Sequence, residues 1–387
     1  MRHLRVLCVA AVYVFLCTDL AIAASASASP APAAATPTAP DSLEQLVRGL
    51  LAPASVQVSG EWFIAYENGK EAGTQYSNFF INRGYINVRK QLLPWLSGRI
   101  TPDISVDRDG DGEGDLELRL KYCYVRADLP DLAFITTPAV EFGLIERPWL
   151  GFEQKVNRYR VLGNMFLERE DILNSADFGA VIEGTFGGEM DKEYRSTVNS
   201  SWAGRYGSYS IGFFNGGGYH AIERNNNKAL EGRISLRPLP GIISGLQITY
   251  AGTYAKGNTT LSPDWTMHVG YASYEHKHCV LTATWFQGEG DQRGRAVDEN
   301  NVAIPQEGYS AFGELRLGDL PFNLFGRYDH FTVDPDAVVS LVTTRVIAGA
   351  AYRLDRQSML VVDYELDRDD NDVTLLSTVK FSVLYKF

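Results

Sequence analysis

The sequence has little of what helical membrane proteins, disulfide scaffolds and nucleic-acid-binding proteins depend on. Only 45% of its 387 residues are hydrophobic, a poor match for a helical membrane protein built from spans of about 18 or more apolar residues. It holds four cysteines, and its net charge is −11 at pH 7, so nucleic-acid binding is not expected. Tyrosine, phenylalanine and glycine are plentiful instead, with 20, 19 and 36 copies. This mixture favours a β-rich protein with many turns.

Residues 1–23 are expected to be a cleaved signal peptide. Arg2 and Arg5 form a positive n-region, residues 4–17 are apolar, and residues 21–23 offer the small-x-small pattern that a signal peptidase cuts. A single membrane anchor is the alternative, but Asp19 shortens its span. Cleavage removes two arginines and one aspartate, so the net charge of −11 becomes −12.

Two short segments follow the signal peptide. Residues 24–40 are an Ala/Pro/Ser-rich linker without the bulk to pack a core. Residues 41–53 begin with the capping residues Asp41 and Ser42, place leucines and a valine on one face, and end at Pro53. This pattern predicts one short amphipathic helix exposed in the periplasm.

From about residue 55 to the end, segments of about ten residues alternate apolar and polar side chains. Residues 116–124 place Leu116, Leu118, Leu120, Tyr122 and Tyr124 on one face and Glu117, Arg119 and Lys121 on the other. Alternation with a period of two predicts strands. A membrane barrel explains many such strands better than a soluble sandwich, because lipid solvates the apolar face and closure satisfies the backbone.

The connections between these strands alternate in length. Short turns are expected at 92–96, 129–134, 238–245, 276–278, 318–321 and 355–358, with one overlong member at 187–207. Longer polar loops are expected at 67–77, 107–115, 148–173, 215–228, 257–265, 288–307, 332–342 and 367–373. This spacing predicts a transmembrane, antiparallel, up-and-down barrel of about sixteen strands over residues 55–387, with short periplasmic turns and long external loops.

The C-terminal strand ends on an aromatic residue. Val379, Phe381, Val383, Tyr385 and Phe387 form one unbroken apolar face. This pattern resembles the final strand of bacterial outer-membrane barrels, which the barrel-assembly machinery reads. The resemblance implies that the machinery is a partner through Phe387, in the outer membrane of a Gram-negative bacterium with its lipid and lipopolysaccharide.

Basic residues dominate several polar strand faces, which face the interior of a membrane barrel. The expected pore-lining residues are Arg83, Arg89, Arg99, Arg119, Lys121, Arg233, Arg237, Arg316, Arg327, Arg345, Arg353 and Lys380. Rings of Arg and Lys favour anions in pores, and the planar Arg fork fits carboxylates and phosphates. The alternative is that these cations pair with neighbouring acids and only keep the lumen wet.

Residues 148–173 form the longest clear loop and combine aromatic with charged side chains. A loop of this length is usually functional, and its apolar content favours packing against the barrel interior. We expect it to fold inward as a constriction loop; the alternative is an outward lid or a surface-binding loop. Its candidate charged residues are Glu153, Lys155, Arg158, Arg160, Glu168, Glu170 and Asp171.

Three stretches, residues 157–170, 212–240 and 382–387, resemble the phosphate-selective porin family of Gram-negative outer membranes. The resemblance covers most of residues 55–387. It implies a sixteen-stranded barrel, usually a homotrimer, that passes small anions or nutrients passively. Lys121 and Lys380 are the only clear inward strand lysines, so the arginine ladder and lysine cluster of the family's best-known members are not mapped here residue by residue.

Residues 107–115 read Asp-Arg-Asp-Gly-Asp-Gly-Glu-Gly-Asp and suggest a calcium site. Asp107, Asp109, Asp111 and Asp115 match EF-hand ligand positions, but Leu118 stands where a bidentate Glu is needed and the flanks are strands. A looser calcium site stays open beside the simpler interpretation of an acidic external hairpin loop. No cofactor is expected.

The sequence therefore predicts an outer-membrane porin that passes small hydrophilic solutes by diffusion and favours anions. Enzyme activity is not expected, because no histidine sits in a recognisable serine-hydrolase motif. Two alternatives stay open: a channel specific for phosphate or another oxyanion, and a surface barrel for adhesion or ion binding. The pairing of Cys123 and Cys279 also stays open; alternation places Cys123 on the lumen face and Cys279 beside a turn.

Overall fold

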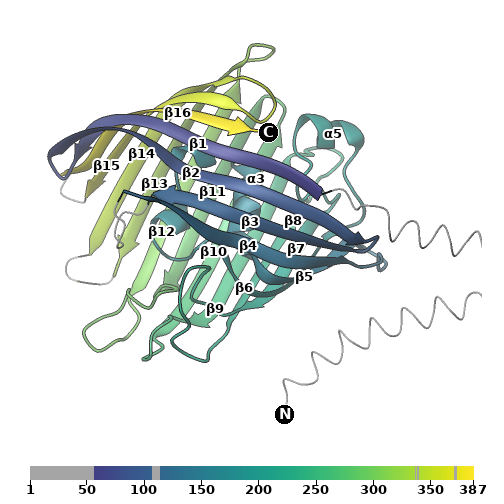
Figure 1. The fold of residues 1–387 in the computed structure, drawn as a ribbon, viewed down its shortest axis with the longest axis horizontal. Helices are drawn as coiled ribbons and strands as arrows, with labels where there is room; N and C mark the ends of the chain where they lie inside the picture. The colour runs from purple at the N-terminus through teal and green to yellow at the C-terminus, as the bar shows by residue number, and fades with distance from the viewer. Residues whose placement is uncertain (1–55, 107–113, 336, 338–339, 370–372) are drawn as a thin grey trace, which may run out of the picture. The chain divides into compact units, whose positions relative to one another are not determined.

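The computed structural model describes residues 56–106, 114–335, 337, 340–369 and 373–387. They form one closed antiparallel barrel of sixteen strands (Figure 1). Each strand pairs with the next, and β16 closes the barrel by pairing with β1. The predicted all-β barrel of sixteen strands is confirmed. The signal peptide, the linker and the helix predicted at 41–53 lie outside the described residues.

The strands run in chain order around the barrel. They are β1 (Val56–Glu71), β2 (Thr74–Leu93), β3 (Leu96–Val106), β4 (Leu116–Asp128), β5 (Ile135–Glu146), β6 (Ala176–Phe186), β7 (Gly207–Phe214), β8 (Ala229–Leu236), β9 (Leu246–Lys256), β10 (Asp264–His276), β11 (Cys279–Glu289), β12 (Pro305–Arg316), β13 (Phe322–Val333), β14 (Leu341–Arg353), β15 (Met359–Asp369) and β16 (Thr374–Lys386). Most connections alternate in length as predicted, with exceptions at the first hairpin and at residues 187–206. We call the two ends of the barrel the short-turn end and the long-loop end.

The first hairpin differs from its prediction. A long loop was expected at 67–77, but β1 continues to Glu71 and β2 starts at Thr74. Ala72 and Gly73 form a two-residue turn with φ values of 45° and 83°. Two positive φ values give the turn a twist that matches the flanking strands, so the hairpin can continue through a polar stretch.

The outward faces of the strands are apolar. Leu118, Phe213, Tyr254, Leu324 and Phe381 are among the large side chains exposed there. An outer surface of this kind suits lipid, while a closed sheet leaves no unpaired edge inside it. At the closure, the amide of Gly60 donates to the carbonyl of Phe387 at 3.0 Å, and the Phe387 ring occupies the space that a Cβ on Gly60 would need.

A β-bulge in β4 corrects the predicted orientation of its second half. Pro102 pairs with Leu120 and Thr101 with Tyr122, which leaves Lys121 without a partner residue. The extra residue turns both Lys121 and Tyr122 into the interior, where each is buried. Tyr122 and Tyr124 therefore face inward, and Cys123 is exposed on the outer face. The prediction of Cys123 on the lumen face is wrong.

The described helices are short and lie in two connecting segments. Residues 147–175 contain α3 (Pro148–Val156), η1 (Arg160–Leu162) and α4 (Phe166–Arg169), and residues 187–206 contain α5 (Lys192–Thr197). Within the described part of the chain, no helix is long and apolar enough to cross a membrane. We call residues 147–175 the inner loop and residues 187–206 the short-turn segment.

Candidate functional site

The inner loop lies inside the barrel and supplies much of its apolar core. Trp149, Phe152, Phe166 and Leu167 are each at most 1% exposed. Helix α3 contacts β7, β8 and β9, and the Trp149 ring meets the ring of Tyr271 on β10 edge to face at 5.1 Å. These side chains belong to one apolar core that also contains strand residues such as Val269 and Phe331. Burial against the wall of the barrel therefore holds the loop in the lumen.

Arg147 anchors the start of the inner loop. Its guanidinium is fully buried and lies 2.9 Å from the Asp177 carboxylate and 2.6 Å from the Glu231 carboxylate. Asp177 also accepts a hydrogen bond of 2.7 Å from the amide of Gly216. The planar fork of Arg147 thus joins the loop to β6 and β8 at once.

A second ion pair lies within the inner loop. Arg160 of η1 donates through both of its Nη atoms to the Glu168 carboxylate on α4, with Nη2 to Oε1 at 2.8 Å. Burial acts to raise the pKa of Glu168, but the guanidinium of Arg160 outweighs it and lowers this pKa to about 2. The pair therefore stays ionised at neutral pH and closes η1 onto α4.

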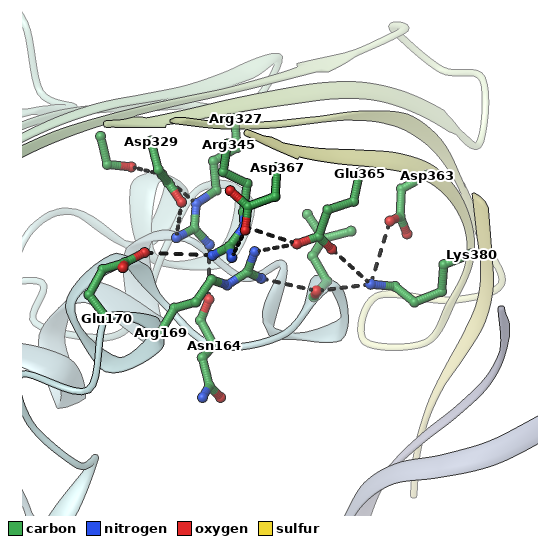
Figure 2. A network of polar contacts seen from close by, with 12 residues as sticks. Asn164, Arg169, Glu170, Arg327, Asp329, Arg345, Asp363, Glu365, Asp367 and Lys380 are labelled. Carbon is green, nitrogen blue, oxygen red and sulfur yellow. Dashed lines mark hydrogen bonds and ion pairs between the residues drawn. The ribbon is translucent and has the colours of Figure 1, made fainter. Parts of the chain in front are cut away.

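A buried network of ion pairs fastens the other side of the loop to the wall formed by β13–β16. Figure 2 shows Arg169 and Glu170 of the loop meeting charged side chains of the strands. Arg169 lies 2.7 Å from Glu365, and Glu170 lies 3.6 Å from Arg345. The other wall members include Arg327 paired with Asp329 at 2.7 Å, Asp367 paired with Arg345, and Lys380 3.5 Å from Asp363. These charges compensate one another and leave little net field on this side.

Asn164 joins the middle of the inner loop to two separate strands of the barrel. Arg83 of β2 donates to its side-chain oxygen at 2.9 Å, and Arg327 of β13 donates to its backbone carbonyl at 2.9 Å. Both bonds are charge-assisted, which makes them stronger than ordinary amide hydrogen bonds. The middle of the inner loop is therefore held by two strands, β2 and β13, that do not pair with each other.

Open space remains beside β2, β3 and β4. A cavity of about 280 Å³ lies towards the long-loop end and is lined by Arg83, Arg119 and Asp103 among others. A cavity of about 420 Å³ lies towards the short-turn end and includes Arg99 and Glu146 in its lining. Tyr85, Lys121 and Arg160 line both cavities. These three residues lie between the two cavities, and we call this place the narrow point.

Lys121 is a buried cation with an unusual environment. It is 3% exposed, and its Nζ donates to the hydroxyl of Tyr85 at 3.1 Å. The same Nζ lies 4.7 Å from the Tyr85 ring centroid and 5.7 Å from those of Tyr122 and Tyr219. Among the described residues no carboxylate forms an ion pair with it. Aromatic faces attract a cation, but they leave it free to bind an anion.

The structure separates the predicted pore-lining residues into two groups. Seven line described cavities: Arg83, Arg89, Arg99, Arg119, Lys121, Arg316 and Arg353. The other five pack beneath connecting segments: Arg233, Arg237, Arg327, Arg345 and Lys380. Lys380, for example, donates to the carbonyl of Leu162 in η1 at 3.0 Å.

The predicted loop charges also take different places. Lys155, Arg158 and Arg160 line the 420 Å³ cavity, whereas Glu168 and Asp171 line the 280 Å³ cavity. Glu153 is buried, and burial raises its pKa to about 8 against the influence of Arg327. Glu153 is therefore mostly neutral at pH 7, and the one remaining charge of α3, Lys155, is basic and meets open space.

The calcium hypothesis is not tested by the fold. Asp107, Asp109 and Asp111 lie outside the described residues, and Asp115 is exposed just before β4. Among the residues that the structure describes, no group of three or more His, Cys, Asp or Glu side chains could hold a metal ion.

Sequence reasoning missed three parts of this site. Arg147 gave no signal beyond its position before Pro148, and Asn164 acts through partners 81 and 163 positions away in the chain. The short-turn segment gave one signal, which was its unusual length for a turn at that end of the barrel.

No protein-family model and no curated protein matches the sequence. Solved structures, in contrast, do match the chain. A loop L8 deletion mutant of OmpT, an outer membrane protein of Vibrio cholerae, aligns at a TM-score of 0.58 and 13% identity, covering 86% of this chain and 99% of that one. The chain has the fold of outer-membrane porins.

Two further porin-fold structures are similar. An anion-selective porin from Comamonas acidovorans gives a TM-score of 0.58 at 12% identity and covers 86% of this chain and all of that one, 100%. The outer membrane channel DcaP of Acinetobacter baumannii gives 0.51 at 12% identity, with 87% and 98% covered.

Proposed function

We propose that this protein is an outer-membrane channel through which small hydrophilic solutes diffuse passively, with a preference for anions. The closed barrel, its apolar outer face and the cavities beside β2–β4 support a channel. The likeness of the fold to an anion-selective porin and to other outer-membrane porins agrees with it. No turnover chemistry is part of this proposal.

The unpaired ammonium of Lys121 carries the proposal of anion preference. It lies at the narrow point that both cavities share, so a solute that crosses the barrel beside β2–β4 passes it. The 420 Å³ cavity is lined by seven basic and two acidic side chains, and the 280 Å³ cavity by five basic and three acidic ones. A narrow, low-dielectric path of positive charge concentrates anions.

A channel specific for phosphate or another oxyanion is the second candidate. The aromatic surround of Lys121 favours it, because a partly desolvated ammonium beside Arg160 binds an oxyanion more strongly than an open lumen does. Conductance that saturates with one anion supports this specific form, whereas conductance that rises linearly with every small anion supports a general channel. A barrel used for adhesion or ion binding would show neither pattern of conductance, because it would not conduct.

The remaining expectations belong to the same proposal. Residues 1–23 would direct export, and residues 24–53 would form the linker and the periplasmic helix. Phe387 would serve assembly in the outer membrane, among its lipid and lipopolysaccharide. A homotrimer is supported by OmpT of Vibrio cholerae, a similar structure that is described in a trimer form.

Substitution of Lys121 tests the proposal. We expect Lys121→Gln to lower the anion-to-cation permeability ratio about two- to threefold, because one unpaired charge leaves the narrow point. The measurement is the zero-current potential of single channels in a KCl gradient. Lys90→Gln is the matched control, since Lys90 lies on β2 and is exposed. Equal ratios for Lys121→Gln and the wild type would contradict the role of Lys121.

A further inference from the structure

The short-turn segment folds as a unit of its own. Glu189 and Gly204 form an isolated β-bridge at its base, and the Asp191 side chain caps α5 by accepting from the amide of Tyr194 at 2.7 Å. Met190, Tyr194 and Ala203 form a small apolar core. A connection between two neighbouring strands at this end of the barrel needs only a few residues. This segment is longer and has its own compact structure.

The tip of this segment, residues 198–201, reaches the inner loop from the opposite end of the barrel. Asn199 is 4% exposed and donates to the carbonyl of Lys155 at 2.9 Å and to the Glu275 carboxylate at 2.7 Å. Arg158 of the inner loop donates to the carbonyl of Val198 at 2.6 Å. The tip is thereby fixed to the last turn of α3, to the segment that follows α3, and to β10.

Arg233 clamps the two segments together. Its guanidinium lies 4.4 Å from the ring centroid of Phe152 on α3 and 4.5 Å from that of Trp202 in the short-turn segment. Ser208 and Ser235 also accept hydrogen bonds from it, at 2.9 Å and 2.7 Å. A cation held between two aromatic faces positions both segments against β8.

The tip stands between three cavities at the short-turn end. Ser200 and Ser201 line both the 420 Å³ cavity and a neighbouring cavity of about 500 Å³. Asn199 and Ser200 line both the 420 Å³ cavity and a third cavity of about 640 Å³. A solute that has passed Lys121 therefore meets the tip with one cavity on either side.

The two side cavities differ in charge. Five basic and four acidic side chains line the 500 Å³ cavity, where Arg126 is paired with both Glu141 and Glu183. Five basic and two acidic side chains line the 640 Å³ cavity: Arg158, Arg195, Arg316, Arg353 and Arg356 against Glu314 and Asp355. An anion meets a nearly neutral wall on one side of the tip and a clearly positive wall on the other.

We infer that the short-turn segment divides the exit of the channel into two branches, and that small anions use the branch lined by Arg158, Arg316, Arg353 and Arg356. This inference rests on the proposed function as an anion-preferring channel. The tip of the segment is the divider, and Arg233 is its positioning residue. Selectivity is thus set twice, first at Lys121 and then by the choice of branch.

Matched charge reversals in the two branches test the inference. Arg353 ends β14 and lines the 640 Å³ cavity, and Arg89 lies near the end of β2 and lines the 500 Å³ cavity. We expect Arg353→Glu to lower the chloride-to-potassium permeability ratio about threefold, and Arg89→Glu to change it less than about 1.5-fold. An equal or larger effect of Arg89→Glu would overturn the inference.

Removal of the divider provides the second arm. Replacing residues 190–203 by Asn-Gly fits a two-residue turn to the bridge between Glu189 and Gly204. In this background the two reversals should affect the ratio equally, and a difference that persists would show that the segment does not divide the exit. The first arm does not depend on the folding of this variant. A wild-type channel that prefers cations would refute the proposed function, while the comparison between the reversals tests the divider separately.

Discussion

Arg147 and Lys121 are two buried cations in opposite circumstances. Arg147 has two carboxylates within 3 Å, and it ties the inner loop to the wall. Lys121 has tyrosine rings and one hydroxyl around it. A fully paired buried charge serves the fold, whereas an unpaired one beside open space favours a ligand of opposite charge. Residue type alone does not tell a paired buried cation from an unpaired one. Only the partners that surround each residue in the fold do.

Loss of Arg147 should destabilise the barrel strongly. Arg147→Met keeps most of the side-chain volume but leaves Asp177 and Glu231 buried without a cation, a change that costs about 3–5 kcal/mol. We expect a marked fall in the unfolding temperature in detergent, measured by loss of heat-modifiable migration or by circular dichroism. Arg353→Met is the control, because Arg353 donates to a single exposed carbonyl, that of Leu320. A variant as heat-stable as the control would contradict the anchoring role.

At the scale of elements, alternation predicted the strands but not their irregularities. The period of two assigned the faces of β8 and β15 correctly, because β8 pairs without a register shift and the register of β15 shifts only after Asp367. In β4, Lys121 has no pairing partner on β3. This extra residue shifts the alternation by one position, and every later side chain of the strand changes face. A bulge depends on pairing with β3, so the sequence of β4 alone could not show it.

Cysteine labelling tests the bulge. In a Cys279→Ser background we expect Cys123 to react with a lipid-soluble maleimide and to resist a charged, membrane-impermeant one, because its side chain faces the outer surface of β4. Ser201→Cys, in a chain without other cysteines, is the control for a thiol beside the cavities. Rapid modification of Cys123 by the charged reagent alone would restore the orientation first predicted from the sequence.

The connecting segments were harder to predict than the strands. The aromatic content of residues 148–173 predicted an inward fold, and the inner loop is buried in the barrel. Its helices were not predicted, since α3 spans only nine residues and depends on packing against β7–β9. The length of residues 187–207 was visible in the sequence, but the contact of Asn199 with Lys155 joins segments from opposite ends of the barrel.

At the scale of the whole molecule, the barrel is divided along its length into a fastened side and an open side. The inner loop is fixed to β13–β16 by compensating ion pairs, and the open path follows β2–β4, where basic residues exceed acidic ones. The chain as a whole is acidic, with a net charge of −11. Overall charge therefore says little about the preference of the channel, because the local surplus beside Lys121 has the opposite sign.

The zero-current potential of the wild-type channel in a planar bilayer, across a tenfold gradient of KCl, tests the central claim most directly. The account predicts discrete conductance steps and a potential whose sign corresponds to chloride passing more readily than potassium, with the preference reduced at high ionic strength by screening. A potential with the sign of potassium preference, or a folded barrel that never conducts, would contradict it.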